Sequence, residues 1–121
     1  MWTKAETGIA GENAVVEYLR ARGAIIVERN WRSGRYETDI IAKHKGCLCF
    51  VEVKTRSITG LMPPEAALTP TKCRSLQRSA AIYMAIHHID YECRIDLAAV
   101  DVWPDGRLDV RYIEDAVESH W

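Results

Sequence analysis

Hydrophobic positions near the N-terminus recur with the spacing of one helix face, through Val15 and Leu19. The segment opens on the capping-box pattern Thr3-Lys4-Ala5-Glu6 and ends before Gly23, a residue type common at helix C-termini. The pattern therefore predicts a helix over residues 4–22.

Farther along, the pattern changes to the alternation of strands, interrupted by one more helical segment. Turn residues such as Ser33-Gly34 and Lys45-Gly46 separate the first strands, and Pro104-Asp105-Gly106 joins the last two as a hairpin. Thr69-Pro70 is an N-cap followed by proline at the first helical position, which opens the second helix. The predicted elements are strands over residues 24–30, 36–43 and 47–56, a loop over 60–64, a helix over 70–87, and strands over 94–103 and 107–113.

The resulting order, α-β-β-β-α-β-β, predicts an α/β (α+β) fold in which helices flank one mixed central sheet of about five strands. With 121 residues, 48% hydrophobic and 27% charged, the chain suits a single domain over residues 1–121. Its four cysteines form no C-x-x-C pair and are expected to be free thiols. No apolar run approaches the ~18 residues of a membrane helix, and no signal-peptide pattern opens the chain. We therefore expect a cytoplasmic protein without a membrane partner.

Charge is divided unevenly along the chain, although the net charge is only −1. Residues 1–88 hold 13 Lys and Arg against 8 Asp and Glu, a balance of +5, whereas residues 89–121 hold 3 against 9, a balance of −6. A basic surface is what a polyanionic partner requires. A solvated mixed surface, in which folding brings the two segments together, is the alternative.

One carboxylate interrupts the apolar stripe of the first helix. Glu12 lies three residues after Ile9 and three before Val15, where an apolar side chain is expected. A buried carboxylate is costly unless a cation, a metal ion or several donors compensate it. The alternative is a glutamate at the edge of the stripe that reaches solvent.

The hairpin predicted over residues 36–56 also has charged side chains where its pattern is otherwise apolar. Alternation places Glu37, Asp39 and Ile41 on one face of the first strand, and Glu52 and Lys54 on one face of the second. A two-residue turn between the strands would set Asp39 opposite Glu52 and Glu37 opposite Lys54. A four-residue turn would leave Asp39 diagonal to Glu52 on the same face.

Neighbouring carboxylates repel unless a cation lies between them. Mg²⁺ typically takes one or two carboxylates, several waters and phosphate oxygens, a set to which Asp39 and Glu52 could contribute. Lys54 would point at the same place and could hold an attacking water or offset transition-state charge. A solvated hairpin face with a Glu37–Lys54 pair is the alternative.

Asp39, a gap of twelve residues and Glu52-Val53-Lys54 resemble the core of the PD-(D/E)XK nuclease motif. The surrounding segments of the likeness are Gly11-Glu12-Asn13-Ala14, Arg29-Asn30-Trp31-Arg32, Glu37-Thr38-Asp39-Ile40-Ile41, Phe50-Val51-Glu52-Val53-Lys54-Thr55-Arg56, Pro64-Glu65-Ala66-Ala67, Lys72 and Arg94-Ile95-Asp96. Together they resemble the YraN family, small bacterial proteins described as predicted endonucleases related to archaeal Holliday junction resolvases. The likeness covers nearly the whole chain.

The resemblance implies a restriction-endonuclease-like core and a metal-dependent endonuclease. The catalytic residues that it implies are Glu12, Asp39, Glu52 and Lys54, of which the three carboxylates are the ligands of Mg²⁺ or Mn²⁺. DNA is the implied partner, with branched or structured DNA as a further expectation, and a homodimer follows by analogy with the resolvases. Tyr36 and Thr38 depart from the family, which usually has Gly and Ile there, so that Tyr36 could crowd a phosphate backbone or stack on a base.

Basic side chains around these segments are candidates for phosphate contacts. They are Arg29, Arg32, Arg35, Arg56, Lys72, Arg74 and Arg78. Trp31 could stack on an unpaired base or pack in the core at a strand end. Besides the endonuclease, two hypotheses are carried forward: a non-catalytic nucleic-acid-binding module that keeps the nuclease fold, and a protein adaptor that docks through its acidic C-terminal segment.

Overall fold

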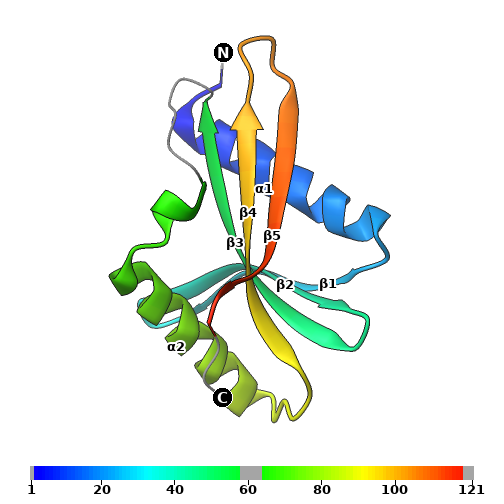
Figure 1. Cartoon of the computed structure of the whole chain (residues 1–121), viewed down its shortest axis with the longest axis vertical. Coiled ribbons are helices and arrows are strands. Elements are labelled where there is room, and N and C mark those ends of the chain that lie inside the picture. The colour runs from blue at the N-terminus through cyan, green and yellow to red at the C-terminus, as the bar shows by residue number, and fades with distance from the viewer. Residues whose placement is uncertain (1, 58–63, 119–121) are drawn as a thin grey trace.

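Five strands form one mixed sheet in the computed structural model, which describes residues 2–57 and 64–118 (Figure 1). The elements in chain order are α1 (Lys4–Ala21), β1 (Ile25–Ser33), β2 (Tyr36–His44), β3 (Cys47–Ser57), the short 3-10 helix η1 (Pro64–Ala67), α2 (Pro70–Ile86), β4 (Cys93–Val102) and β5 (Leu108–Val117). The strand order is β1-β2-β3-β4-β5, antiparallel except for the parallel pair β3 and β4. The predicted fold class and element order are confirmed. Of the predicted loop over residues 60–64, positions 60–63 lie outside the described residues.

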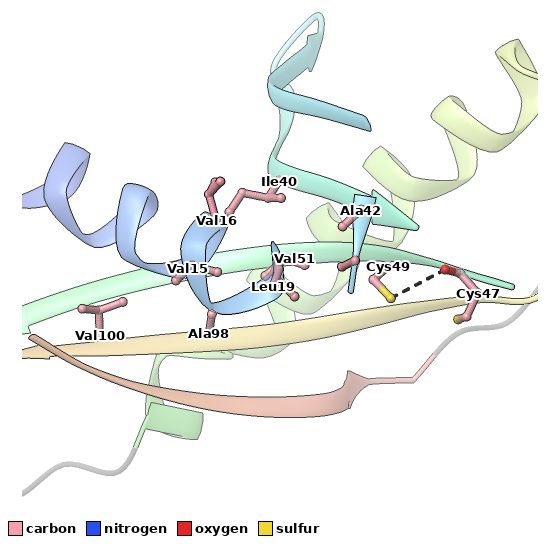
Figure 2. Close-up of a cluster of buried hydrophobic side chains, with 11 residues drawn as sticks. Val15, Val16, Leu19, Ile40, Ala42, Cys47, Cys49, Val51, Ala98 and Val100 are labelled. Carbon is pink, nitrogen blue, oxygen red and sulfur yellow. Dashed lines mark hydrogen bonds between the residues drawn. The ribbon is translucent and has the colours of Figure 1, made fainter. Parts of the chain in front are cut away.

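Helix α1 covers one face of the sheet. Its capping box is formed as predicted, with the Thr3 hydroxyl accepting from the Glu6 amide and the Glu6 carboxylate accepting from the Thr3 amide. Val15, Val16 and Leu19 pack on alternate residues of the strands beneath (Figure 2). Those strand residues are Ile40, Ala42, Cys47, Cys49, Val51, Ala98 and Val100. Within the described ranges, neither helix is long and apolar enough to cross a membrane.

Helix α2 covers the opposite face, because the intervening residues of β3, Leu48 and Phe50, belong to a second core cluster. The buried side of α2 includes Cys73, Leu76, Ala80, Tyr83 and Met84, which all belong to or pack against this cluster. Trp31 packs edge-on against Tyr83, with ring centroids 5.2 Å apart. The core role predicted as one alternative for Trp31 is therefore the one observed.

Strand β1 runs past the predicted end at residue 30 and continues to Ser33. Asn30 has a φ of 52°, in the left-handed region that asparagine tolerates better than most residues. This local break changes the direction of the side chains that follow without ending the pairing with β2, which continues at Trp31, Arg32 and Ser33. Strand β5 likewise extends beyond its predicted end, to Val117.

The sheet divides between β2 and β3. Their ladder follows the register of a two-residue turn, with His44 opposite Cys47, and it ends at the pair Ile40–Val51. Beyond that pair β2 remains bonded to β1 alone, while β3 remains bonded to β4 as far as Ser57. Figure 1 shows the β1–β2 ribbon turning away from the three strands β3, β4 and β5. A fork therefore opens next to Asp39 and Glu52.

The acidic C-terminal segment is partly neutralised inside the fold. Asp96 is buried and accepts hydrogen bonds from Arg94, from the Tyr112 hydroxyl and from the Asp115 amide. Asp101 accepts from both Arg56 and Arg111. Arg56 of β3 is thus a basic residue of the first segment that pairs with an acid of the second, because β3 and β4 lie side by side.

Close approach of α1 to β3 requires glycine at position 11. A Cβ added to Gly11 would lie 1.9 Å from Thr55 Oγ1 and 2.9 Å from Thr55 Cβ, so the helix or the strand must shift. We expect Gly11→Ala to lower the free energy of unfolding by about 1–3 kcal/mol, the usual effect of overpacking. Urea denaturation of both proteins measures this difference.

Gly8→Ala is the matched control, since Gly8 lies in the same helix and an added Cβ would meet nothing within 4 Å. This change should raise stability by about 0.5–1 kcal/mol through helix propensity. Equal effects of the two substitutions would contradict the close helix-strand contact.

Candidate metal and nucleic-acid site

The carboxylate of Asp39 lies at the fork between β2 and β3. Its Oδ2 accepts a hydrogen bond from the backbone N–H of Val53 at 2.8 Å. This N–H points toward the place that β2 vacates after the last ladder pair, Ile40–Val51, and would otherwise lack a partner there. The Asp39 carboxylate therefore bonds across the fork, and this bond places its side chain beside Glu52, the residue next to Val53.

Burial raises the pKa of Asp39 from 3.8 to about 7, and the negative charge of Glu52 adds to the rise. The Val53 hydrogen bond opposes the rise but is the smaller effect. Two carboxylates thus lie close together in partly buried positions, as the register of a two-residue turn predicts. Such a pair is stabilised by a cation placed between its members.

One cation already contacts the pair from α2. Lys72 Nζ lies 2.9 Å from Glu52 Oε2, and the side chain of Glu52 is only 13% exposed. Glu52 and Asp39 together raise the pKa of the Lys72 ammonium against the opposing effect of burial. Lys72 was predicted to contact phosphate, whereas in the structure its charge faces Glu52.

Glu12 is partly buried in the middle of α1 and is compensated by donors from β1. Its Oε1 accepts from Arg29 Nε at 3.0 Å and from Asn30 Nδ2 at 3.1 Å, and Arg29 also donates to Asn13. Side chains of consecutive strand residues normally point to opposite faces. The positive φ of Asn30 accounts for both reaching the same carboxylate. Glu12 is thus not a solvated residue at the stripe edge.

A hollow of about 780 Å³ connects Glu12 with Asp39, whereas Glu52, which contacts Lys72 of α2, does not line it. Its lining includes Glu12, Arg29, Arg32, Glu37, Asp39, Val53 and Lys54, together with the first turns of α1. Lys54 is exposed on the wall of this hollow.

Two expectations about the hairpin are wrong. The Glu37–Lys54 pair does not form, because the ladder ends before it and Glu37 binds Arg32 of β1 at 2.9 Å instead. Ile41 does not stay with Glu37 and Asp39, since it packs in the core under α2 while they line the hollow. The twist at the fork breaks the regular alternation between Asp39 and Ile41.

Within residues 2–57 and 64–118, no three Asp, Glu, His or Cys side chains are arranged as a ready metal cluster. Of the three carboxylates predicted as metal ligands, Asp39 and Glu52 lie together, whereas Glu12 is held by Arg29 and Asn30. Their role as metal ligands stays a prediction.

The basic residues predicted to contact nucleic acid fall into two groups. Four of them are paired with carboxylates: Arg29 with Glu12, Arg32 with Glu37, Arg56 with Asp101 and Lys72 with Glu52. The others, Arg35, Arg74 and Arg78, meet at a separate hollow between β2 and α2. Sequence spacing gives no indication of this division, because each partner comes from a distant segment.

Comparison with known proteins places the chain in a family. Residues 11–100 match the model of the family described as "Uncharacterised protein family UPF0102". The chain belongs to the UPF0102 family. UPF0102 proteins that it resembles include one from Bacteroides thetaiotaomicron, 41% identical over 92% of this chain and 91% of that protein, and one from Symbiobacterium thermophilum, 44% identical over 93% and 96%. The YraN-like family predicted from the motifs is thereby confirmed.

The matched segment of this UPF0102 chain contains all four residues that the resemblance implies as catalytic. Three features of the site could not be taken from the motifs: the turn of β1 at Asn30, the Lys72–Glu52 pair and a buried hydrogen bond of 2.7 Å between Thr38 and Ser79. Thr38, a departure from the family pattern, is thus used to join β2 to α2.

We expect Asp39→Asn to stabilise the protein near pH 8 and to have little effect near pH 4. The folded-state pKa of Asp39, about 7, lies above its unfolded value, 3.8. The stability of the wild type therefore falls as the pH rises from about 4 through about 7. The amide never ionises, so at pH 8 it should add roughly 1–3 kcal/mol. Calorimetric unfolding across this pH range measures the difference.

Glu17→Gln serves as the control, because Glu17 is exposed on α1 and its pair with Arg20 is at the surface. Its effect should be small at every pH. If the stability difference between Asp39→Asn and the wild type is the same at pH 4 and pH 8, ionisation of Asp39 beside Glu52 does not destabilise the fold.

Proposed function

We propose that this protein is a metal-dependent endonuclease that hydrolyses phosphodiester bonds in DNA. The observation that carries the proposal is the pair Asp39 and Glu52 at the fork of the sheet, with the pKa of Asp39 raised to about 7 by burial and by its neighbour. A fold that keeps two carboxylates together at such a cost in charge repulsion is suited to a divalent cation.

Asp39 and Glu52 would hold Mg²⁺ or Mn²⁺, with waters and phosphate oxygens as the remaining ligands. When bound, the ion would supply a more acidic water and stabilise charge on the phosphate oxygens. Glu12 lines the same hollow as Asp39 and would contribute from the far side once released by Arg29 and Asn30. Lys72 would then leave Glu52, since two cations cannot share one small carboxylate site without repulsion.

Lys54 projects from β3 at the edge of the hollow, two residues beyond Glu52. Within the described ranges it makes no ion pair, so its ammonium can face an incoming phosphate or orient a water beside it. The hollow is wide and open to solvent, which suits a polymer better than a small molecule. Family membership supports the proposal through the motif residues it contains, all within residues 11–100.

Cleavage of labelled DNA in Mg²⁺ or Mn²⁺ tests the proposal. Wild-type protein should cut, with branched DNA compared against duplex and single strands, and chelation of the metal should stop the reaction. Asp39→Ala and Glu52→Ala should each lower the rate about 10²-fold or more, the scale of removing one group that stabilises developing charge. Lys54→Ala should also slow cleavage without preventing metal binding.

Glu17→Ala is the matched control, an acidic residue removed from the same chain outside the hollow. Wild-type cleavage no faster than that of Asp39→Ala or Glu52→Ala would reject the enzyme. Metal-independent DNA binding without cleavage would favour the non-catalytic module. If the protein shows no salt-dependent binding to DNA, the result would favour the protein-adaptor hypothesis.

A further inference from the structure

A second hollow, of about 310 Å³, lies between the start of β2 and α2. Its lining residues are Arg35, Tyr36, Thr71, Arg74, Ser75 and Arg78, which we call the arginine pocket. Three guanidinium groups and three hydroxyl groups thus surround one small space. Every one of these side chains can donate a hydrogen bond, and none of the described lining residues carries a carboxylate.

The charge of the arginine pocket is not balanced by the surrounding protein. Several arginines elsewhere are paired closely with carboxylates, as with Arg94 and Asp96 or Arg111 and Asp101. Within residues 2–57 and 64–118, Arg35, Arg74 and Arg78 form no ion pair with a carboxylate. Like charges brought together without a counter-charge repel, so an anion entering this space would stabilise the arrangement.

Tyr36 holds two of the guanidinium groups in place. Its hydroxyl oxygen accepts from Arg35 at 3.0 Å and from Arg78 at 3.1 Å. Arg78 and then Arg35 hold the pKa of this phenol below its ordinary range. Since both lone-pair positions of the oxygen face guanidinium groups, its proton is free to point into the pocket as a further donor. Tyr36 therefore orders the site instead of blocking it.

Two backbone paths connect the arginine pocket with the carboxylate pair. Along β2, Tyr36 and Asp39 are three residues apart, or about 10 Å of backbone at the rise of a strand. Along α2, Arg78 is six residues beyond Lys72, the partner of Glu52, or about 9 Å at the rise of a helix. Each nucleotide adds 3.4 Å along the helix axis and its phosphate also winds around that axis, so a separation of this size spans at most about three nucleotides of one strand.

We propose that the arginine pocket binds one internal phosphate of the nucleic-acid backbone, a few nucleotides from the phosphate presented to Asp39 and Glu52. This inference rests on the proposed function for its ligand, since it assumes that the carboxylate pair faces a nucleic acid. Arg74 and Arg78 contact the phosphate, and Tyr36 is a positioning residue that fixes Arg35 and Arg78. Such a contact sets the register of the strand without reading its sequence.

The test is the binding of a labelled DNA duplex to the full chain in chelator, where no cleavage occurs. Arg74→Gln/Arg78→Gln should raise Kd about ten-fold or more, on the scale of one lost charged contact. It should also reduce the slope of log Kd against log salt by about one. Tyr36→Phe should weaken binding to a smaller extent. Arg20→Gln, an exposed α1 arginine outside the pocket, is the control and should change Kd by less than about two-fold.

A neutral methylphosphonate placed at single backbone positions identifies the phosphate. One position should weaken wild-type binding and have no further effect on the double variant, because the contact is already lost. The idea is overturned if all positions act independently of the double substitution. It is also overturned if the variants bind DNA as tightly as the wild type does, or if the wild type does not bind DNA. A third contradictory result is that binding requires a 5′ terminal phosphate and not an internal one.

These binding results are separable from the endonuclease itself. If Asp39→Ala and Glu52→Ala cut as well as the wild type while the methylphosphonate result is as expected, the nuclease assignment fails and the phosphate pocket stands. If metal-dependent cleavage needs both carboxylates but the double variant binds DNA normally in chelator, the pocket fails and the nuclease stands.

Discussion

The hydrogen bond from the Val53 amide to the Asp39 carboxylate is the contact on which the site depends. A sheet that divides leaves backbone donors without partners, and a partly buried donor of this kind has to be satisfied. A carboxylate from the departing strand satisfies it and is thereby held in a poorly hydrated position beside Glu52. In that position, burial and the charge of Glu52 raise the pKa of Asp39 although the hydrogen bond itself opposes the rise, and Lys72 of α2 contacts the neighbouring Glu52.

The distribution of charge then separates two kinds of basic residue. Most arginines near the fork face carboxylates, so they organise the protein and contribute little to attraction of a polyanion. In the arginine pocket, Arg35 and Arg78 donate instead to the phenol oxygen of Tyr36, and Arg74 donates to the hydroxyl of Thr71. Helix α2 carries both Lys72 and this pocket, which gives the helix a functional as well as a packing role.

The sequence predicted those features that depend on local patterns. Either turn considered at Lys45-Gly46 places Asp39 near Glu52, and the interrupted helix stripe predicted that Glu12 is either compensated by a partner or solvated at the edge. Features that depend on contacts between distant segments could not be predicted from the sequence. The Arg78–Tyr36 contact joins residues 42 positions apart, and the break in alternation near Ile41 arises from the divergence of two strands, which periodicity within one strand does not express.

Anomalous diffraction from a crystal soaked in Mn²⁺ is the decisive measurement, because it locates the ion without requiring activity. We expect an anomalous peak between the carboxylates of Asp39 and Glu52, with Lys72 displaced from Glu52, and no such peak in Asp39→Asn. A soaked crystal without a peak at this place, in which Lys72 still contacts Glu52, would contradict this expectation.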